Sequence, residues 1–479
     1  MTLVAGVDCS TQSTKVVVVD ESGKIVAQAS APHRVTGTGG ARETDPAVWE
    51  SALATALRAT GRAAEVEAIS IAGQQHGLVV VDGDGRPLRP SMLWNDTRSA
   101  SDAAAIVETL GGDQRIADRV GSTLTPAFTV SKWAWLRRNE PEVAAAARGV
   151  RLPHDHINAV LTGQASTDRS DASGTGWWSP ADEAYAGDVL GLPAVDLDPA
   201  RLPPVLGPGD SAGTVTPAAS ERFGLRAGVV VGAGVADNAS AGLALALEPG
   251  EAALSLGTSG TAFATSPTPS ADPSGVVAGF ASADGRYLPL ACTLNATVAV
   301  DRVASWLGVK RHEVEPSGGI VCLPWLDGER TPNLPTASGS LWGLRQDSTP
   351  GAILQAAYEG AAATLLEAAD VVGRWSVVDP STPLLLVGGG ARGEVWRQTV
   401  LRLSGRALQL PDNQELVAYG AAVQAHATLT SRPAGDVAKA WDGRRGAVLD
   451  AVEPDTTTRR RIKAWSDAVA GLVHGDGID

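Results

Sequence analysis

The chain has 479 residues, a length that exceeds one ordinary folded core and predicts two domains. Hydrophobic residues make up 44% of it and charged residues 19%, so the composition is that of a globular protein and excludes wholesale disorder. The formal net charge of -14 argues against nucleic acid and against an anionic membrane as partners, because both attract positively charged surfaces.

The first predicted elements are short strands joined by tight turns. The run from Leu3 to Ala31 alternates apolar stretches with turns and predicts an antiparallel meander of three strands. It shows no signal-peptide pattern, and no stretch of the chain reaches membrane-spanning length, so the cytoplasm is the expected compartment. Asp45 and Pro46 then form an N-cap and N1 pair, which predicts a helix as far as Gly61.

Two polar loops follow the predicted helix. The first runs from Gly73 to Gly77 between two apolar strand candidates, and the second runs from Trp94 to Arg98. Their amide, imidazole, carboxylate and guanidinium groups are those that recognise a polyol. The candidate substrate-binding residues are Gln75, His76, Trp94, Asp96 and Arg98. A charged residue in a loop can equally be structural, and for Arg98 both interpretations stay open.

A structural metal site is the weaker interpretation of the remaining ligand-type residues. The triplet His154-Asp155-His156 places two imidazoles beside a carboxylate, but no third ligand lies at helical or hairpin spacing. The three cysteines show neither CxxC spacing nor a Cys/His pattern. We therefore expect inert thiols, and a metal site at the histidine pair is not favoured.

The domain boundary is expected where the composition changes. Residues 187–213 are dense in Gly, Pro and Asp, and the apolar run that starts at Gly228 opens a new series of strands and helices. The sequence therefore predicts a first domain over residues 1–228 and a second domain over residues 229–479.

The two predicted domains share one local pattern. Residues Asp8 to Thr14 and residues Ser255 to Thr261 both join strand-like runs through small hydroxyl or Gly residues. Such turns direct several backbone N-H groups into one concavity, where phosphate oxygens can bind. One turn of this kind is more often only a tight hairpin, but its recurrence in each half favours phosphate binding and predicts a duplicated α/β fold.

Asp237 and Asn238 stand where an apolar strand candidate meets a predicted helix that runs to about Leu247. A carboxylate at such a junction can act as general base for a substrate hydroxyl if a cleft lies above it. The alternative is a plain N-cap aspartate.

A glycine-rich turn follows the strand candidate Leu384 to Val387. Its sequence, Gly388-Gly389-Gly390-Ala391-Arg392-Gly393, fits GxGxxG, and Asp412 lies about where a Rossmann acid would stand. The rest of the chain offers no further βαβ unit, so we expect the turn to approach adenosine instead of a nicotinamide cofactor. A P-loop NTPase is excluded because GxxxxGK[ST] does not occur.

The ordered set of motifs resembles the FGGY family of carbohydrate kinases, in the actin, Hsp70 and hexokinase superfamily. The resemblance covers nearly the whole chain. The segments that carry it are Asp8 to Thr14, Ala72 to Gly77, Leu93 to Arg98, Phe128 to Leu136, Ser170 to Thr175, Asp237 with Asn238, Leu254 to Gly260, Gly328 to Pro332, and Gly388 to Arg392 with Trp396 and Arg397.

The resemblance implies two RNase-H-like α/β domains around a catalytic cleft, with sugar bound mainly by the first domain and ATP mainly by the second. Asp237 matches the family's catalytic base, and Asp8 matches the catalytic carboxylate near Mg²⁺ and phosphate. The implied ketose-binding residues are Gln75, His76, Trp94, Asp96, Arg98, Asp237 and Asn238. The implied ATP-binding residues are Ser10, Thr11, Gln12, Ser13, Gly257, Thr258, Ser259, Gly388, Gly389, Gly390 and Ala391.

Within the family, the resemblance is strongest to members that phosphorylate D-xylulose, so D-xylulose, ATP and Mg²⁺ are the expected ligands. Gln75 departs from the Met that such members commonly carry, and another ketose or polyol such as ribulose is the alternative. The Arg-Glu pair of glycerol-specific members is absent. The resemblance is compatible with a homodimer. A sugar-responsive regulator would need a helix-turn-helix before Asp8, and an Hsp70-like ATPase a peptide-binding domain after Thr430; neither is expected.

Overall fold

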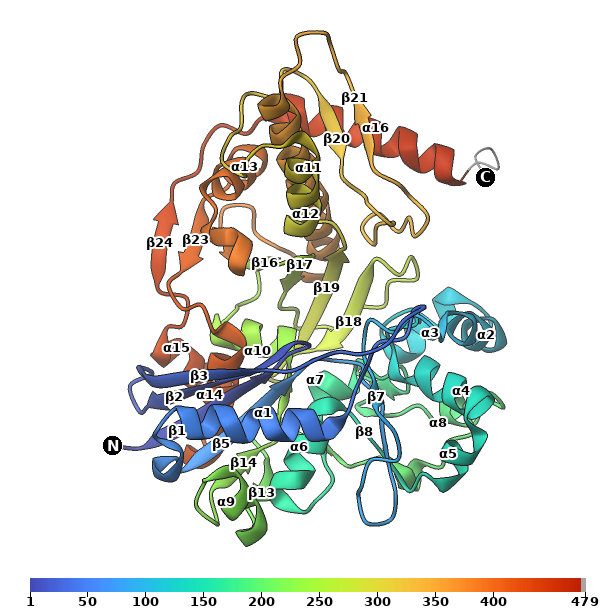
Figure 1. Cartoon of the computed structure of the whole chain (residues 1–479), viewed down its shortest axis with the longest axis vertical. Coiled ribbons are helices and arrows are strands. Elements are labelled where there is room, and N and C mark those ends of the chain that lie inside the picture. The colour runs from blue at the N-terminus through green and yellow to red at the C-terminus, as the bar shows by residue number, and fades with distance from the viewer. Residues whose placement is uncertain (475–479) are drawn as a thin grey trace.

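The computed structural model describes residues 1–474 as two lobes, each built on a seven-stranded sheet (Figure 1). The first sheet has the order β13-β14-β5-β1-β2-β3, with β15 paired to β5. Its strands are β1 (Leu3–Cys9), β2 (Ser13–Asp20), β3 (Ile25–Pro32), β5 (Ala68–Gly73), β13 (Ser211–Thr214), β14 (Val230–Gly232) and β15 (Val235–Ala236). The predicted meander is confirmed, since β1, β2 and β3 pair antiparallel.

The second sheet has the order β18-β19-β17-β16-β22-β23-β24. Its strands are β16 (Ala252–Leu256), β17 (Gly260–Ala264), β18 (Val277–Ala281), β19 (Tyr287–Thr293), β22 (Leu384–Val387), β23 (Leu408–Pro411) and β24 (Gly446–Leu449). In both sheets an antiparallel hairpin is followed on its inner side by two parallel strands, β1-β5-β14 in one and β16-β22-β23 in the other. The predicted duplication of the fold is therefore confirmed.

Helices cover both faces of each sheet. The helices of the first half are α1 (Pro46–Ala59), α2 (Ala100–Leu110), α3 (Asp113–Val120), α4 (Thr129–Asn139), α5 (Pro141–Ala146), α6 (Pro153–Thr162), α7 (Arg169–Ala172), α8 (Gly187–Leu190), α9 (Pro217–Phe223) and α10 (Asp237–Ala244). Those of the second half are α11 (Thr297–Leu307), α12 (Pro350–Ser376), α13 (Glu394–Ser404), α14 (Leu416–Thr430), α15 (Ala434–Trp441) and α16 (Thr456–His474). None of these helices is both long and apolar enough to cross a bilayer.

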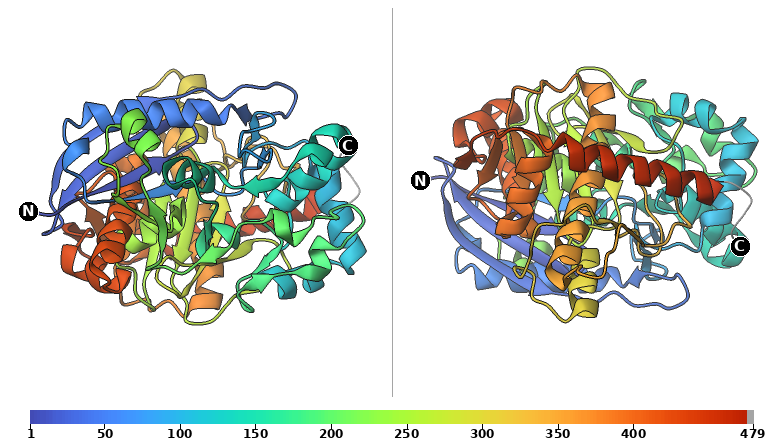
Figure 2. Two further views of the ribbon diagram at one scale, coloured as in Figure 1. Left: turned by 90° about the horizontal axis from the view of Figure 1, so that it is seen from below. Right: turned by 90° about the horizontal axis from the view of Figure 1, so that it is seen from above.

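Short strand pairs extend the two lobes. They are β4 (Glu43–Thr44) with β7 (Ser91–Met92), β6 (Val79–Val81) with β8 (Gly149–Arg151), β9 (Thr167–Asp168) with β12 (Val205–Leu206), β10 (Trp178–Ser179) with β11 (Ala184–Tyr185), and β20 (Val321–Leu323) with β21 (Ser340–Trp342). Figure 1 shows α16 at the end of the molecule away from the first sheet, and the right view of Figure 2 shows it lying across that end.

The first sheet is buried between α1 and a helix of the opposite half. Trp49, Leu53 and Leu57 of α1 pack on one face, while α14 packs with α10 on the other, against β1 and β5. Figure 2 shows α14 and α15, drawn in red, beside the blue strands of the first sheet. The contact is close because glycines form it: a Cβ on Gly6 would lie 1.9 Å from the Ala418 carbonyl oxygen, and one on Gly420 would lie 1.9 Å from that of Ser240.

The pairing of strands bears on where the halves divide. Both β14 and β15 lie after the expected boundary at residues 228/229, yet they pair with β5 of the first sheet. We propose that the first domain extends through α10, so that the division falls between the end of α10 and the start of β16.

Candidate active site

A cavity of about 310 Å³ lies where the two halves meet, and its walls come from both. It brings together eight of the residues selected from the sequence: Gln75, His76, Trp94, Asp237, Asn238, Gly257, Thr258 and Ser259. The cavity is therefore bordered on one side by the polar loop after β5 and on another by the turn between β16 and β17.

Asp237 enters the cavity from the first turn of α10. The N-cap of this helix is Ala236, so Asp237 is the first helical residue and not the cap. Its Oδ1 accepts hydrogen bonds from the backbone N-H of Asn238 at 2.7 Å and from Asn238 Nδ2 at 2.8 Å. Burial, reinforced by the negative charge of Asp8, raises the pKa of Asp237 to about 7. A carboxylate with such a pKa is suited to accept a proton near neutral pH.

Gln75 and His76 are fixed by α7 and the residues that follow it. Gln75 Nε2 donates to the Ser170 carbonyl oxygen at 3.2 Å, and His76 Nδ1 lies 2.5 Å from the carbonyl oxygen of Gly174. Burial and the positive charge of Lys132 lower the pKa of His76 to about 3, so the ring is neutral. Since a carbonyl only accepts, the proton is on Nδ1, and Nε2 can accept a hydrogen bond from a hydroxyl.

The loop that holds Trp94 divides its residues between the cavity and a salt-bridge network. Trp94 lines the cavity and donates its Nε1-H to Thr11 Oγ1 at 3.0 Å. Asp96 and Arg98 do not line it: Arg98 Nη2 lies 2.7 Å from Asp96 Oδ2, and its guanidinium carbon lies 4.4 Å from the ring centroid of Trp135. Their part in substrate binding stays a prediction, and their contacts in this structure stabilise the loop itself.

The first predicted phosphate turn lies between β1 and β2, outside the cavity lining. Asp8 accepts a hydrogen bond from Ser10 Oγ at 2.6 Å, and Thr11 Oγ1 donates to Gln74 Oε1 at 3.2 Å. Gln12 offers its carbonyl to the N-H of His33 at 2.8 Å, and the Ser13 carbonyl accepts from the N-H of Ser10 at 3.0 Å. The turn is thus joined through Thr11 to the loop of residues 73–77, which we call the sugar-side loop.

The other two predicted nucleotide segments lie in the second half. Thr297 Oγ1 donates to the carbonyl of Gly257 at 2.8 Å, which fixes the turn between β16 and β17 on α11. Gly389 and Gly390 line a separate cavity of about 930 Å³, bordered also by α12 and α13, whereas Gly388 and Ala391 line a smaller one of about 220 Å³. The glycine-rich turn therefore has open space on both sides.

Asp8 is the residue that the sequence predicts near a bound cation. Its side chain is 7% exposed, burial raises its pKa, and Lys15 Nζ lies 3.9 Å from Oδ2. No cluster of three or more His, Cys, Asp or Glu within residues 1–474 could hold a metal by itself. Mg²⁺ fits this donor set, because it is usually held by one or two carboxylates together with waters and substrate phosphates.

Several cavity residues were not selected from the sequence as site residues. Phe128 and Phe280 both contact the His76 ring, at centroid distances of 4.9 and 5.6 Å, and their own centroids lie 6.5 Å apart; Arg330 and Thr293 also line the cavity. Phe128 and Arg330 occur in segments that carry the family resemblance, which is the signal that could have identified them. Phe280 and Thr293 reach the cavity only through the pairing of β18 and β19 in the second sheet.

Comparisons with known proteins identify the same family in both halves of the chain. Residues 3–244 match the N-terminal domain and residues 252–429 the C-terminal domain of the FGGY family of carbohydrate kinases. The chain is 55% identical to a xylulose kinase of Streptomyces rubiginosus, covering 99% of this chain and 98% of that protein. It is 33% identical to a xylulose kinase of Escherichia coli (strain K12), covering 84% and 85%. The crystal structure of xylulose kinase from Bifidobacterium adolescentis, 34% identical, superposes with a TM-score of 0.84 over 97% of this chain and 99% of that one.

Proposed function

Because the chain belongs to the FGGY family of carbohydrate kinases, we propose that it phosphorylates D-xylulose with ATP to give D-xylulose 5-phosphate. The observation that carries this proposal is the cavity, which Asp237 lines together with Gln75 and His76, whose side chains suit a polyol, and with the turn at Thr258, which suits a phosphate. The names of the relatives support D-xylulose as the acceptor.

The proposed mechanism is in-line transfer of the γ-phosphoryl group. Asp237 accepts the proton of the ketose terminal hydroxyl as that oxygen attacks phosphorus, and Asn238 holds the carboxylate in place. Neutral His76 accepts a hydrogen bond from a sugar hydroxyl, while the backbone N-H groups of Thr258 and Ser259 bind phosphate oxygens. Arg330 supplies positive charge at the wall of the cavity.

The cofactor assignments follow from the same arrangement. We place the nucleoside in the cavity beside Gly389 and Gly390, and the phosphates between the turn at Gly257 to Ser259 and the turn at Ser10 to Ser13. Mg²⁺ held at Asp8 would supply charge neutralisation at the phosphates. The cytoplasm, where ATP is available, is the proposed compartment, and a homodimer is the proposed assembly.

A panel of acceptors tests the proposal. ADP release is measured with D-xylulose, D-ribulose, L-ribulose, L-xylulose, gluconate and glycerol, and we expect D-xylulose to give the highest kcat/KM. A higher value for D-ribulose would transfer the assignment to the alternative that Gln75 raises. A higher value for glycerol or gluconate would refute the ketose assignment and leave the kinase class standing.

A further inference from the structure

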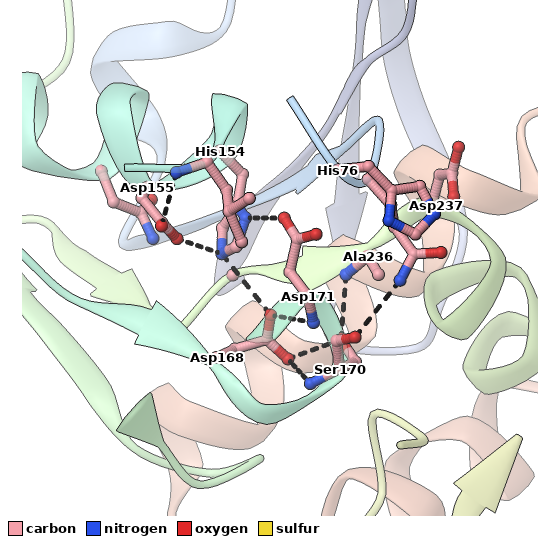
Figure 3. Close-up of polar contacts among 12 residues, drawn as sticks. His76, His154, Asp155, Asp168, Ser170, Asp171, Ala236 and Asp237 are labelled. Carbon is pink, nitrogen blue, oxygen red and sulfur yellow. Dashed lines mark hydrogen bonds and ion pairs between the residues drawn. The ribbon is translucent and has the colours of Figure 1, made fainter. Parts of the chain in front are cut away.

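A buried cluster of titratable side chains lies beneath the proposed active site and has no part in the mechanism above. His154 of α6 is 0% exposed, and its Nδ1 lies 2.6 Å from Asp171 Oδ2. Its Nε2 lies 3.3 Å from Asp155 Oδ1 and 3.5 Å from Asp168 Oδ1 (Figure 3). One imidazole therefore contacts the carboxylates of three aspartates, whose side chains are at most 3% exposed.

The cluster fixes residues 168–174, which we call the anchor segment. Asp168 Oδ2 accepts hydrogen bonds from the N-H of Ser170 at 2.7 Å and from its hydroxyl at 2.5 Å, while Oδ1 accepts from the N-H of Asp171 at 3.1 Å. Asp168 and Asp171 also contact His154 directly. Helix α6 thus holds the anchor segment through two of the segment's side chains, those of Asp168 and Asp171.

The anchor segment contacts the residue before the proposed base and also the two cavity residues of the sugar-side loop. The Ser170 hydroxyl accepts a hydrogen bond at 2.9 Å from the N-H of Ala236, the residue that precedes the proposed base (Figure 3). The Ser170 carbonyl holds the amide of Gln75, and the Gly174 carbonyl holds the ring of His76. One short segment therefore orients the proposed base and the two residues expected to read the sugar.

His154 also contacts the two loops directly. A Cβ on Gly73, where the sugar-side loop begins, would lie 2.8 Å from His154 Cβ, and one on Gly234, before the base, would lie 2.1 Å from His154 Cδ2. Asn158, one turn further along α6, donates to the Ala233 carbonyl at 2.9 Å. Both loops thus rest on the same helix.

Burying four titratable groups together is costly, and replacing buried ionic groups by apolar ones is often neutral or stabilising. Burial raises the pKa of Asp171 to about 7, and the surrounding carboxylates raise that of His154 to about 10, against its own burial. Stability alone therefore does not account for these buried groups, which favours a role in fixing the geometry of the residues that they contact.

We propose that the cluster of His154, Asp155, Asp168 and Asp171 is a positioning device for phosphoryl transfer, acting through Ser170 on the turn that carries Asp237. The inference rests on the proposed function, since it takes Asp237 as the base. The cluster itself touches neither substrate. Its contribution is to hold the base and the sugar-side residues in one geometry.

Ser170→Ala is the discriminating variant, because it removes the bond to the Ala236 N-H but keeps the carbonyl that holds Gln75. We expect kcat to fall roughly 10-fold to 100-fold, as for a misplaced catalytic group, with the ketose KM within about twofold of wild type. The matched control is Ser179→Ala. This serine is equally buried, donates to Asp182 Oδ2 at 3.0 Å and accepts from the Asp182 N-H at 3.2 Å, so it loses the same kinds of hydrogen bond far from the base.

Should Ser170→Ala not fold, Asp168→Asn keeps the side-chain shape but replaces one of its two oxygens by an NH2 group, so it can no longer accept from Ser170 and from the Asp171 N-H together. The same kcat loss is expected from it. Equal kcat in wild type and in the folded Ser170 or Asp168 variant would overturn the inference. An equal kcat loss in Ser179→Ala would overturn it as well.

A double-mutant cycle with Asp237→Asn separates this inference from the proposed function. If Ser170 acts through Asp237, Ser170→Ala lowers kcat in the wild-type background but has no further effect in Asp237→Asn. An equal fall in both backgrounds would overturn the inference alone. Near-normal kcat in Asp237→Asn by itself would instead remove the base from the proposed function, and the route through Ser170 with it.

Discussion

Asp237 is a carboxylate that loses its proton about three pH units later than a free aspartate, because burial and the charge of Asp8 raise its pKa from 3.8 to about 7. Only the deprotonated form can accept the proton of a sugar hydroxyl. We therefore expect kcat/KM to fall as pH drops through about 7, with a slope of one proton, and to be level above it. A pH profile from 5.5 to 9 checks this, and a kcat/KM that stays level down to pH 5.5 would contradict it.

Asp237→Asn tests the same carboxylate by removing its basicity at constant shape. We expect a loss of roughly 100-fold to 10,000-fold in kcat, with ketose affinity retained. A group whose pKa is raised by folding favours the folded state below its unfolded pKa, and that contribution is lost as pH rises through about 7. The variant should thus melt no lower than wild type at pH 8. Unchanged kcat in a fully folded variant would rule out the base role.

At the residue scale, the sequence predicted those cavity residues that come directly after a strand. Gln75, His76 and Asp237 are such residues, since the end of a strand and the next turn determine their place. Phe280 could not be predicted, because it reaches His76 only after the two sheets have come together. The surroundings of His154 could not be predicted, because the carboxylates that contact it lie up to 17 positions further along the chain.

Glycines at helix contacts determine how closely α14 approaches its neighbours. A Cβ at Gly420 would meet the Ser240 carbonyl oxygen of α10 at 1.9 Å, a backbone atom that cannot rotate away. We expect Gly420→Ala to destabilise the protein by about 1–3 kcal/mol, as overpacking does. Gly435→Ala is the control, because Gly435 lies in α15 with no atom within 4 Å of the added carbon.

Chemical denaturation of the two variants measures the difference. Gly435→Ala should be neutral or more stable by up to about 1 kcal/mol, since Ala is the better helix former. Equal stability of the two variants would show that α10 and α14 have room to separate. Because α10 begins with Asp237, we expect Gly420→Ala to lower kcat as well.

At the element scale, local patterns predicted the two hairpins, the helix after Asp45 and the strand-turn-helix unit at Gly388. These elements are specified by turn residues and caps within a few positions. The helix at Asp237 was expected to reach about Leu247, but it ends at Ala244, and Ala246 has a positive φ of 46°. The place of α14 could not be predicted, because no local signal links it to strands such as β5, whose Ser70 donates to Gln424 of α14 across 354 positions of the chain.

If the large cavity beside Gly389 binds adenosine, a nucleotide should stabilise the whole molecule against thermal unfolding. A ligand at 100 times its Kd stabilises the folded state by about 2.7 kcal/mol. We expect ATP with Mg²⁺ to raise the melting temperature and NAD to have no effect at the same concentration. Stabilisation by NAD alone would restore the dinucleotide interpretation of the GxGxxG turn.

The packing of α14 on the first sheet also determines when that sheet can be completed during synthesis. Its central strands, β1 and β5, leave the ribosome long before residues 416–430 exist. At about 5–20 residues per second, the interval is roughly 20–70 s. Throughout it, Val4, Val17 and Val19 lack the alanine-rich surface that covers them in the finished molecule. The nascent first half is therefore the stage at which this protein is most exposed to aggregation, and at which we expect chaperones to engage it.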